Sequence, residues 1–483
     1  MAPLPNNFFQ PKNQAEYTSQ RQQNWEMLAR RGDSRSPFSA EYHHRLTELH
    51  RQIVSPGQRV LEIGCGRGDL LAALQPSYGL GVDFSPLMLA AARNRHPGLN
   101  FLLAEAHSLP VNETFDVILL SDLVNDLWDV QTALEQLRPL CQPHTRLIVS
   151  LHSRLHQPAI SLAGKVGLAQ NVLPQNWLTP EDLENLLHLA GFEVIRRQRE
   201  MLLPAPIPLI NDFCNKFLVK LPPFDSLAWI NLLTARPQAQ PAATAPRVSV
   251  IIPARNEAGN IENVFRRLPR MGAETEIVFV EGHSRDNTYE TIEKAIAAHP
   301  EWKCQLHKQN GKGKADAVRL GFDQASGDVL MILDADLTVR PEDLPRFYHV
   351  IASGAGEFIN GVRLVYPMQE QAMRFLNLLG NKFFSLAFSW ILGQSLKDTL
   401  CGTKVLYKRD YQRIAANRAY FGEFDPFGDY DLIFGAAKQN LKIIDLPIRY
   451  QERTYGSTNI DRWRHGLLLI RMVIFAAFRL KFI

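Results

Sequence analysis

Short apolar segments alternate with longer amphipathic segments along most of the chain. Residues 59–63 (RVLEI), 115–120 (FDVILL), 247–252 (RVSVII) and 329–333 (VLMIL) are of the first kind, and glycine, proline or acidic residues follow each closely. Strands that alternate with helical segments are typical of mostly parallel sheets covered by helices. Since the pattern occurs in both halves of the chain, it predicts an α/β fold with two domains.

A segment rich in Pro, Ala and Gln separates the two halves. It covers residues 234–246 (TARPQAQPAATAP), has no apolar period and is typical of an extended linker. The predicted organisation is an N-terminal extension (1–39), a first domain (40–200), an apolar connecting segment (201–233), the linker (234–246), a second domain (247–460) and an amphipathic C-terminal helix (461–483).

Composition narrows the class of protein. Hydrophobic residues make up 46% and charged residues 21% of the 483 residues, as in ordinary globular proteins. A net charge of +4 is too small to indicate a nucleic-acid partner. The five cysteines form no CxxC pair, which argues against a zinc site or a disulfide framework and favours a reducing cytoplasm.

Polar residues follow the predicted strands of the first half. Residues 59–63 lead into Gly64-Cys65-Gly66-Arg67-Gly68, where glycines permit positive φ and close approach of a ligand to the backbone. Asp83 ends the next strand, where an acid can accept hydrogen bonds from ribose hydroxyls. Two further strands end near Glu105 and at Ser121-Asp122. These strand ends predict a nucleoside-binding crevice at one edge of a sheet.

The glycine spacing is GxGxG and not the GxGxxG of dinucleotide enzymes. With GVDFSPLML and FDVILLSDLVNDLWD, the stretch VLEIGCGRGDLL resembles class I S-adenosylmethionine-dependent methyltransferases over about residues 40–200. The resemblance implies a Rossmann-like domain with S-adenosylmethionine as cofactor. Its loop would lie against the methionine part, Asp83 would hold the ribose, Glu105 and Ala106 would border the adenine, and Ser121 would lie near the methyl group. The residues assigned to the cofactor are Glu62, Gly64, Gly66, Gly68, Asp83, Glu105, Ala106 and Ser121.

The methyl acceptor stays open. Methyl transfer needs mainly the positioning of a nucleophile, sometimes with a general base. Asp122, Asp126 and His152 are candidates for that base, although such residues also occur as solvated side chains or caps. Residues 201–233, apolar and broken by prolines, could cover the acceptor, pack against the second domain or touch a membrane.

The second half carries two carboxylates directly after a strand. Asp334 and Asp336 are two residues apart beyond residues 329–333, so they point in the same direction. Adjacent anionic oxygen ligands suit Mg²⁺ or Mn²⁺, which share ligands with phosphates. Such a metal can stabilise a diphosphate as it leaves. Lys312-Gly313-Lys314 opens a helix and offers either a phosphate contact or a solvated turn.

Seven motifs in this half resemble inverting family 2 glycosyltransferases, especially dolichol-phosphate mannose synthases and bacterial polyprenyl-phosphate glycosyltransferases. They include VSVIIPARNEAGNI, GDVLMILDADLTV, DTLCGTKVLYKRD and RYQERTYGSTNI, and they cover about residues 247–460. The resemblance implies a GT-A-type domain, a nucleotide-sugar donor and a polyprenyl-phosphate acceptor. It assigns the nucleotide sugar to Pro253, Ala254, Glu257, Glu281, Lys314 and Asp334, the metal to Asp334 and Asp336, the phosphates to Arg363, Arg374 and Arg453, and the acceptor region to Asp398.

Two departures from the family pattern leave alternatives open. The chain has Glu281-Gly282 where the family usually has an Asp-Asp pair, so uridine and guanosine donors both remain possible. Residues 424–431 (FDPFGDYD) are more acidic than the corresponding family stretch, and Asp431 falls nearest the position where many inverting relatives carry their acid. Asp429 and Asp431 are candidate bases for a hydroxyl acceptor, whereas a phosphate acceptor is already anionic and hardly needs a base. Either carboxylate can instead cap or pair locally.

Two segments near the C-terminus are amphipathic, and no stretch is an uncharged apolar span. Residues 375–393 carry Asn and Ser at intervals of four, and residues 466–483 place Arg471 and Arg479 among Leu, Ile, Phe and Met. A span would bury Arg471 at a cost of about 2.5–3.5 kcal/mol. We therefore expect peripheral attachment to the cytoplasmic surface of the cell membrane, with core or dimer contacts as the alternative.

Together these patterns predict a bifunctional enzyme. The second domain would transfer a sugar with inversion, using Mg²⁺ or Mn²⁺, and the first would transfer a methyl group. The alternative is a glycosyltransferase that acts on a hydroxyl acceptor, with the first domain as a non-catalytic binding or regulatory module.

Overall fold

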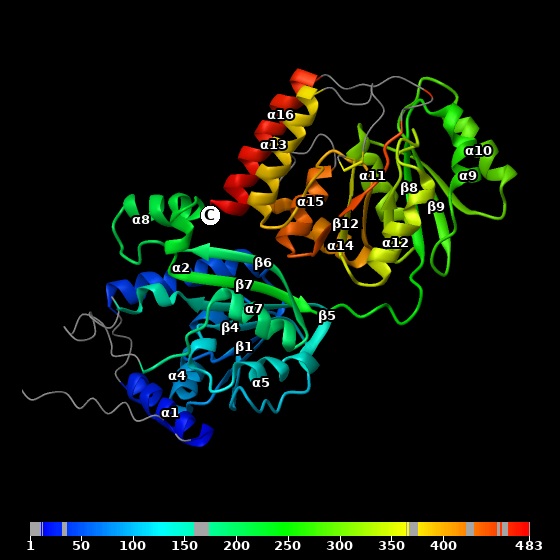
Figure 1. The fold of residues 1–483 in the computed structure, drawn as a ribbon. Helices are drawn as coiled ribbons and strands as arrows, with labels where there is room; N and C mark the ends of the chain where they lie inside the picture. Colours follow the sequence, from blue (N-terminus) through cyan, green and yellow to red (C-terminus); the bar gives the residue numbers. More distant parts are fainter. Residues whose placement is uncertain are drawn as a thin grey trace, which may run out of the picture. The chain divides into compact units, whose positions relative to one another are not determined.

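The computed structural model describes residues 11, 13–30, 36–158, 173–363, 365–366, 375–421, 429–451, 455 and 462–482. The chain divides into two compact units, Met1–Gln238 and Ala239–Ile483. Each unit is built on one seven-stranded sheet with helices packed against it (Figure 1). This confirms the prediction of two Rossmann-like α/β domains.

The sheet of unit 1 has the order β3-β2-β1-β4-β5-β7-β6, and only β7 runs antiparallel to its neighbours. Its central strands are apolar and buried because helices cover both faces. The carboxyl ends of the other strands therefore meet at one edge. The strands are β1 (Arg59–Ile63), β2 (Tyr78–Asp83), β3 (Asn100–Leu103), β4 (Phe115–Ser121), β5 (Cys141–His152), β6 (Phe192–Glu200) and β7 (Ile230–Pro237).

Several helices of unit 1 begin at side chains that satisfy their first backbone N–H groups. Ser85 Oγ accepts from the backbone of Met88, and Thr179 with Asp182 forms a capping box. The helices are α1 (Gln14–Arg30), α2 (Pro37–Ile53), α3 (Asp69–Ala73), α4 (Pro86–Arg95), α5 (Val130–Glu135) and α7 (Pro180–Leu189).

Strand β7 differs from the sequence-based expectation. The predicted linker begins at Thr234, but β7 continues to Pro237 and pairs with both β5 and β6. Thr234 and Ala235 are fully buried. The sequence did not predict this strand, because the segment is rich in proline and its partner strands β5 and β6 are distant in the sequence. The segment before it forms α8 (Ile210–Asp212), η4 (Phe213–Phe217), η5 (Leu218–Lys220) and η6 (Phe224–Leu227).

The sheet of unit 2 has the order β10-β9-β8-β11-β13-β12-β14, with β13 antiparallel to β11 and β12. Parallel pairing elsewhere again brings strand ends to one edge. The strands are β8 (Val248–Ala254), β9 (Thr275–Glu281), β10 (Lys303–Lys308), β11 (Val329–Ile332), β12 (Phe358–Val362), β13 (Lys404–Tyr407) and β14 (Ile443–Pro447).

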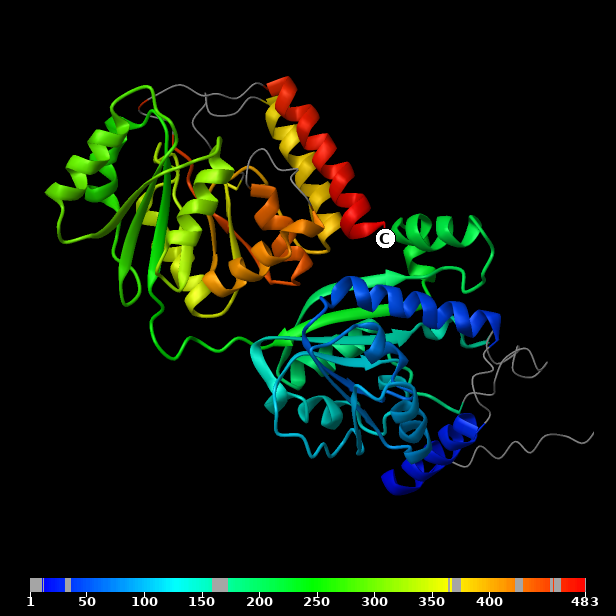
Figure 2. The ribbon, with the colours of Figure 1, turned by 180° about the vertical axis from the view of Figure 1, so that it is seen from behind.

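Helices flank this sheet, and two of them form a pair. The helices α13 (Phe375–Leu392) and α16 (Arg462–Ala476) lie side by side in both views (Figure 2). Phe388 and Met472 of this pair are part of the buried core of the unit. The others are α9 (Ile261–Arg267), α10 (Thr288–Ala298), α11 (Lys314–Gln324), α12 (Leu344–Ala352), α14 (Lys408–Ala416) and α15 (Asp429–Lys438).

Candidate functional sites

The glycine-rich loop of unit 1 connects β1 to α3 at the carboxyl edge of the sheet. Gly64, Gly66 and Gly68 have φ angles of 72°, 52° and 74°, in the left-handed region that favours glycine. A Cβ atom on Gly64 would lie 2.9 Å from Leu123 Cδ1. The Gly66 N–H donates to Asp83 Oδ2 at 2.8 Å. The loop is therefore held tightly with its backbone at the edge of the crevice.

Two buried carboxylates lie beneath this loop. Asp83 accepts from Ser85 N through Oδ1 at 2.9 Å, and burial raises the pKa of Asp83. Glu62 Oε2 has no partner among the described residues. Burial, with the nearby Asp83 charge and against a hydrogen bond from the Leu71 backbone, raises the pKa of Glu62 to about 8. An unpartnered carboxyl oxygen here fits a ligand with a hydrogen-bond donor, such as the amino acid part of S-adenosylmethionine.

The ends of β3 and β4 border the same crevice. Glu105 Oε1 accepts from Thr18 Oγ1 at 2.9 Å, and Ala106 packs at the rim of the core. Ser121 ends β4, and Ser150 Oγ lies 3.5 Å from its hydroxyl. The structure thus brings the residues expected at the cofactor to one edge of the sheet. It also adds α1, which carries Thr18 and which no sequence motif indicated.

The three candidate bases differ in their surroundings. Asp122 accepts from Tyr42 Oη at 2.9 Å. Asp126 is held by Arg21, with Nη1 2.8 Å from Oδ1. His152 ends β5. Asp122, which follows Ser121 directly, is the carboxylate next to the expected methyl position.

Unit 2 gathers charged residues at the ends of β11 and α11. Lys314 Nζ lies 2.6 Å from Asp334 Oδ1. Burial alone would lower the pKa of Lys314, but the charges of Asp334 and Asp429 raise it above its ordinary value. A Cβ atom on Gly402 would lie 2.0 Å from Asp334 Oδ2, so this glycine is required for the close approach. The cluster of Lys314, Asp334 and Asp429 is the centre of the second candidate site.

The two carboxylates expected to hold a metal have different hydrogen-bond partners. Asp336 Oδ1 accepts from the backbone N–H of Thr338 at 3.1 Å and from its hydroxyl at 2.8 Å. In the described part of the chain, no group of three or more His, Cys, Asp and Glu side chains could hold a metal by itself. Two carboxylates fit Mg²⁺ or Mn²⁺ that takes its remaining ligands from water and a diphosphate. Asp334 and Asp336 are the residues that would hold it.

The residues expected at the nucleotide lie at the ends of β8 and β9. Pro253 and Ala254 end β8. Glu257 is buried and accepts from Asn260 Nδ2 at 2.7 Å. Glu281 ends β9, and its Oε1 accepts from Ser284 N at 2.5 Å. Both carboxylates thus shape the loops of this edge.

Arg363 is held in place by Asp398. Its Nε lies 2.7 Å from Asp398 Oδ2, and its Nη2 lies 2.9 Å from Oδ1. Burial would raise the pKa of Asp398, but the guanidinium holds it below its ordinary value. A paired guanidinium fixed in this way keeps further N–H donors for a phosphate. Arg374 and Arg453, expected to act with it, lie outside the described residues.

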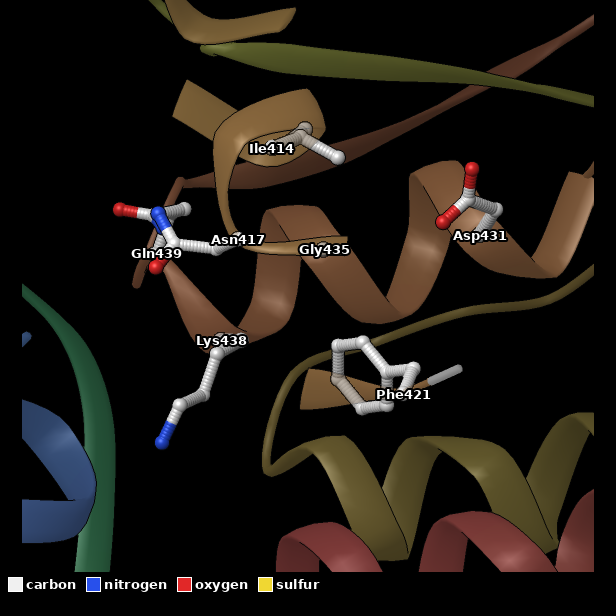
Figure 3. A pocket seen from close by; sticks show the side chains of 7 residues that line it. All are labelled: Ile414, Asn417, Phe421, Asp431, Gly435, Lys438 and Gln439. Atoms are coloured by element: carbon white, nitrogen blue, oxygen red, sulfur yellow. The ribbon is translucent and has the colours of Figure 1, made fainter. Parts of the chain in front are cut away.

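Asp429 and Asp431 lie on the same helix but have different partners. Asp431 Oδ2 accepts from Arg418 Nε at 2.8 Å and from Arg319 Nη2 at 3.2 Å. Figure 3 shows it among the residues that line a shallow surface crevice. Asp429 Oδ1 lies 3.8 Å from Lys404 Nζ. The crevice is lined by Ile414, Asn417, Phe421, Asp431, Gly435, Lys438 and Gln439.

Lys404 is a residue that the sequence did not indicate. It begins β13, its side chain is fully buried, and Nζ donates to the Cys401 carbonyl. Lys404 and Lys314 therefore both interact with the carboxylate of Asp429. Strand β13 lies between β11 and β12 in the sheet, and only this pairing shows that the lysine is buried.

The outer face of the α13–α16 pair is apolar and exposed. Seven large side chains, more than a third exposed each, cover this face, with Arg471 exposed among them. Such a surface marks a contact with a membrane or another protein. In the described residues, no helix is both long and apolar enough to cross a membrane. The seven are Phe383, Leu386 and Trp390 of α13, Leu467, Ile470 and Ile474 of α16, and Phe478 of η10 (Ala477–Lys481), which follows α16 directly.

Two mostly parallel sheets, each with polar residues at its carboxyl edge, are typical of α/β domains that bind a ligand at that edge. Residues 60–144 match the family described as "Methyltransferase domain", and residues 249–413 match "Glycosyl transferase family 2". The chain therefore carries a methyltransferase domain followed by a family 2 glycosyltransferase domain. Both resemblances are confirmed.

Relatives of the second half include sugar transferases. A dolichol-phosphate mannosyltransferase of Pyrococcus furiosus is 39% identical over 44% of this chain and 59% of its own length. A polyprenol monophosphomannose synthase of Mycolicibacterium smegmatis is 26% identical over 46% of this chain and 84% of its own. An S-adenosylmethionine-dependent methyltransferase structure from Thermotoga maritima is 20% identical, covering 45% of this chain and 95% of its own, with a TM-score of 0.32. The chain thus spans less than two thirds of the Pyrococcus relative.

Proposed function

We propose that the chain is a bifunctional enzyme. Unit 2 transfers a sugar from a nucleotide sugar to a polyprenyl-phosphate lipid, with inversion and with Mg²⁺ or Mn²⁺. Unit 1 transfers a methyl group from S-adenosylmethionine to the same glycoconjugate. The cluster of Lys314, Asp334 and Asp429 at the carboxyl edge carries the proposal for unit 2, supported by relatives named for dolichol phosphate and polyprenol.

The residues of unit 2 divide the work of sugar transfer. Asp334 and Asp336 would hold a divalent metal, which would supply positive charge to a departing diphosphate. Lys314, at the start of α11, exchanges its contact with Asp334 for a phosphate oxygen. Arg363, fixed by Asp398, binds a further phosphate. An acceptor phosphate attacks the anomeric carbon without losing a proton, from the face opposite the diphosphate, and this single displacement inverts the centre.

The residues of unit 1 bind and orient the methyl donor. The loop from Gly64 to Gly68 would hold the amino acid part of the cofactor, and Glu62 could accept a hydrogen bond from it. Asp83 supports the loop and the ribose. Asp122, next to Ser121, is placed to accept a proton from a hydroxyl acceptor. The bound cofactor supplies an electrophilic methyl group, so positioning is the main task of the protein.

The α13–α16 pair attaches unit 2 to the cytoplasmic surface of the membrane. Each large apolar side chain that enters the lipid contributes up to about 1.5–3 kcal/mol. An arginine near anionic headgroups contributes about 1 kcal/mol. Seven exposed apolar residues with Arg471 among them fit this mode of binding.

A hydroxyl acceptor is the second candidate, and Asp429 favours it. This carboxylate belongs to the charged cluster, and among the described residues it has no arginine pair like the one that holds Asp431. It is therefore available as a base for a hydroxyl. In this case unit 1 serves as a non-catalytic binding module.

Binding measurements on one protein test both sites. Calorimetric titration with a nucleoside diphosphate and Mn²⁺, and separately with S-adenosylhomocysteine, is expected to show one site for each. Asp334→Asn should lose the metal-dependent nucleotide site and keep the other. Asp328→Asn is the matched control, since Asp328 precedes the same strand and is exposed. If the wild type and both variants bind the nucleotide equally well without a metal, the proposed metal site is wrong. If S-adenosylhomocysteine does not bind, the proposed methyltransferase activity is wrong.

A further inference from the structure

Helix α1, expected only as part of an N-terminal extension, lies against segments assigned to the cofactor. Gln14 Nε2 and Thr18 Oγ1 donate to Glu105 Oε1 at 3.2 and 2.9 Å. Gln22 Nε2 donates to the Phe84 carbonyl, directly after β2, at 3.0 Å. The inner face of α1 therefore meets the ends of β2 and β3, where the nucleoside is expected.

The C-terminal end of α1 reaches the glycine-rich loop. Arg67, in the middle of that loop, donates through Nη2 to the Leu28 carbonyl at 3.2 Å. Helix α1 also packs along α4. A single helix thus bonds to the loop after β1, the end of β2 and the end of β3, which makes it the outer wall of the crevice.

Arg21 joins this wall to the loop after β4. It is 5% exposed, and Nη1 lies 2.8 Å from Asp126 Oδ1. Its guanidinium lies 4.3 Å above the ring of Tyr17, which in turn contacts Trp128 edge to face at 5.3 Å. Separating a buried charge pair costs free energy, so we expect α1 and the loop after β4 to move together.

The same arginine reaches the segment that follows residue 172. Arg21 Nη2 donates to the Pro174 carbonyl. Gln175 Nε2 donates to Asp126 Oδ1 at 3.0 Å, the atom that Arg21 also contacts. Asn176 Nδ2 donates to the Leu127 carbonyl at 2.7 Å. Residues 173–176 are thereby attached to the loop after β4, beside the expected methyl position.

We propose that α1 closes over the bound nucleoside and that Arg21 is a positioning residue that couples this closure to residues 173–176. Cofactor binding then organises the acceptor side, so the cofactor binds before the acceptor. The proposal rests on the proposed methyltransferase function. It assigns Gln14, Thr18 and Gln22 to the cofactor wall, which no motif indicated.

Hydrogen–deuterium exchange of the full chain with S-adenosylhomocysteine tests the coupling. In the wild type the ligand is expected to slow exchange in residues 14–30 and 173–176. In Arg21→Gln the ligand should still protect the glycine-rich loop but no longer residues 173–176, and it should dissociate about tenfold faster. Arg21→Lys should restore part of the coupling. Gln23→Ala, on the exposed face of α1, is the matched control and should behave as wild type.

A second variant separates coupling from loss of folding. Gln22→Ala removes one hydrogen bond from a half-buried side chain next to the control position and should also speed dissociation. Wild-type dissociation rates in both Arg21→Gln and Gln22→Ala, or unchanged exchange of α1 on binding, would overturn the proposal. If the wild type itself does not bind S-adenosylhomocysteine, the proposed methyltransferase function fails and this inference fails with it.

Discussion

Buried ionisable side chains at the two sheet edges differ in whether an opposite charge compensates them. Glu62 is buried without a compensating cation, whereas Lys314 lies between two carboxylates. Burial favours the neutral form of an isolated acid, and paired charges favour the ionised form of both partners. Each arrangement leaves a group prepared for a ligand: an acceptor in unit 1 and a cation in unit 2.

Glu62 predicts a pH dependence of stability. Its folded pKa of about 8 exceeds its ordinary value of 4.5, so between these values the folded protein keeps a proton that the unfolded chain releases. The free energy of unfolding of unit 1 should therefore fall as pH rises through this window. In Glu62→Gln the decline should be smaller, with the largest gain at pH 8. Calorimetry without cofactor checks this, with the exposed Glu135→Gln as control; equal slopes in all three proteins would refute it.

Gly402 predicts a loss confined to sugar transfer. In Gly402→Ala the new Cβ displaces the carboxylate of Asp334 and the amine of Lys314. Displacement of catalytic groups by about 1 Å costs about 100-fold in rate. S-adenosylhomocysteine binding should not change. Gly380→Ala, where a Cβ meets nothing within 4 Å, is the control. Wild-type glycosyl transfer in Gly402→Ala would contradict the placement of the site.

Asp429 and Asp431 predict opposite phenotypes. Asp431→Asn leaves Arg319 and Arg418 without their shared carboxylate and should lower the stability of unit 2 by about 1–3 kcal/mol, since both arginines are partly exposed. Its sugar transfer should persist. Asp429→Asn should slow transfer, because it removes the carboxylate that interacts with Lys314 and Lys404. Melting temperatures and initial transfer rates, measured on the same samples, distinguish these two effects. If Asp431→Asn abolished transfer without changing stability, Asp431 and not Asp429 would be the residue needed for transfer.

At the scale of elements, the sequence predicted the parallel strands well and the reversed strands poorly. Strands β1, β4, β8 and β11 are apolar on both faces and end at polar turns, which is a local signal. Strand β7 is recognisable only through its pairing with β5 and β6. Helix α1 has no apolar stripe from which its packing could be predicted, because its contacts with the crevice are polar. Local patterns reveal buried strands, whereas contacts between distant polar residues require the fold.

The α13–α16 pair predicts binding to lipid vesicles. Replacing Leu386 and Ile474 by Ser removes two exposed apolar side chains and should reduce flotation with anionic vesicles at least tenfold. Leu103→Ser with Leu189→Ser, both exposed leucines of unit 1, is the matched control. Equal flotation of both double variants would contradict membrane attachment. A change from dimer to monomer in the Leu386 and Ile474 variant would identify a dimer contact instead.

At the scale of the whole molecule, one chain links two transferase domains through residues 238–247. The cofactors proposed for them are distinct, and each candidate site is built from residues of one unit. A linker of this length keeps the two domains at a high effective concentration for each other. The pairing of sugar transfer and methylation in one chain is compatible with consecutive steps on one lipid-linked sugar.

One transfer assay tests this account most directly. The purified full chain, Mn²⁺ and a short polyprenyl phosphate are mixed with each common uridine or guanosine diphosphate sugar, and the organic extract is analysed by mass spectrometry. We predict that one donor gives a glycosyl phospholipid, and that S-adenosylmethionine then adds the mass of one methyl group to it. Hydrolysis of a donor with no lipid product from any of them would contradict the polyprenyl-phosphate acceptor and leave the hydroxyl acceptor in its place.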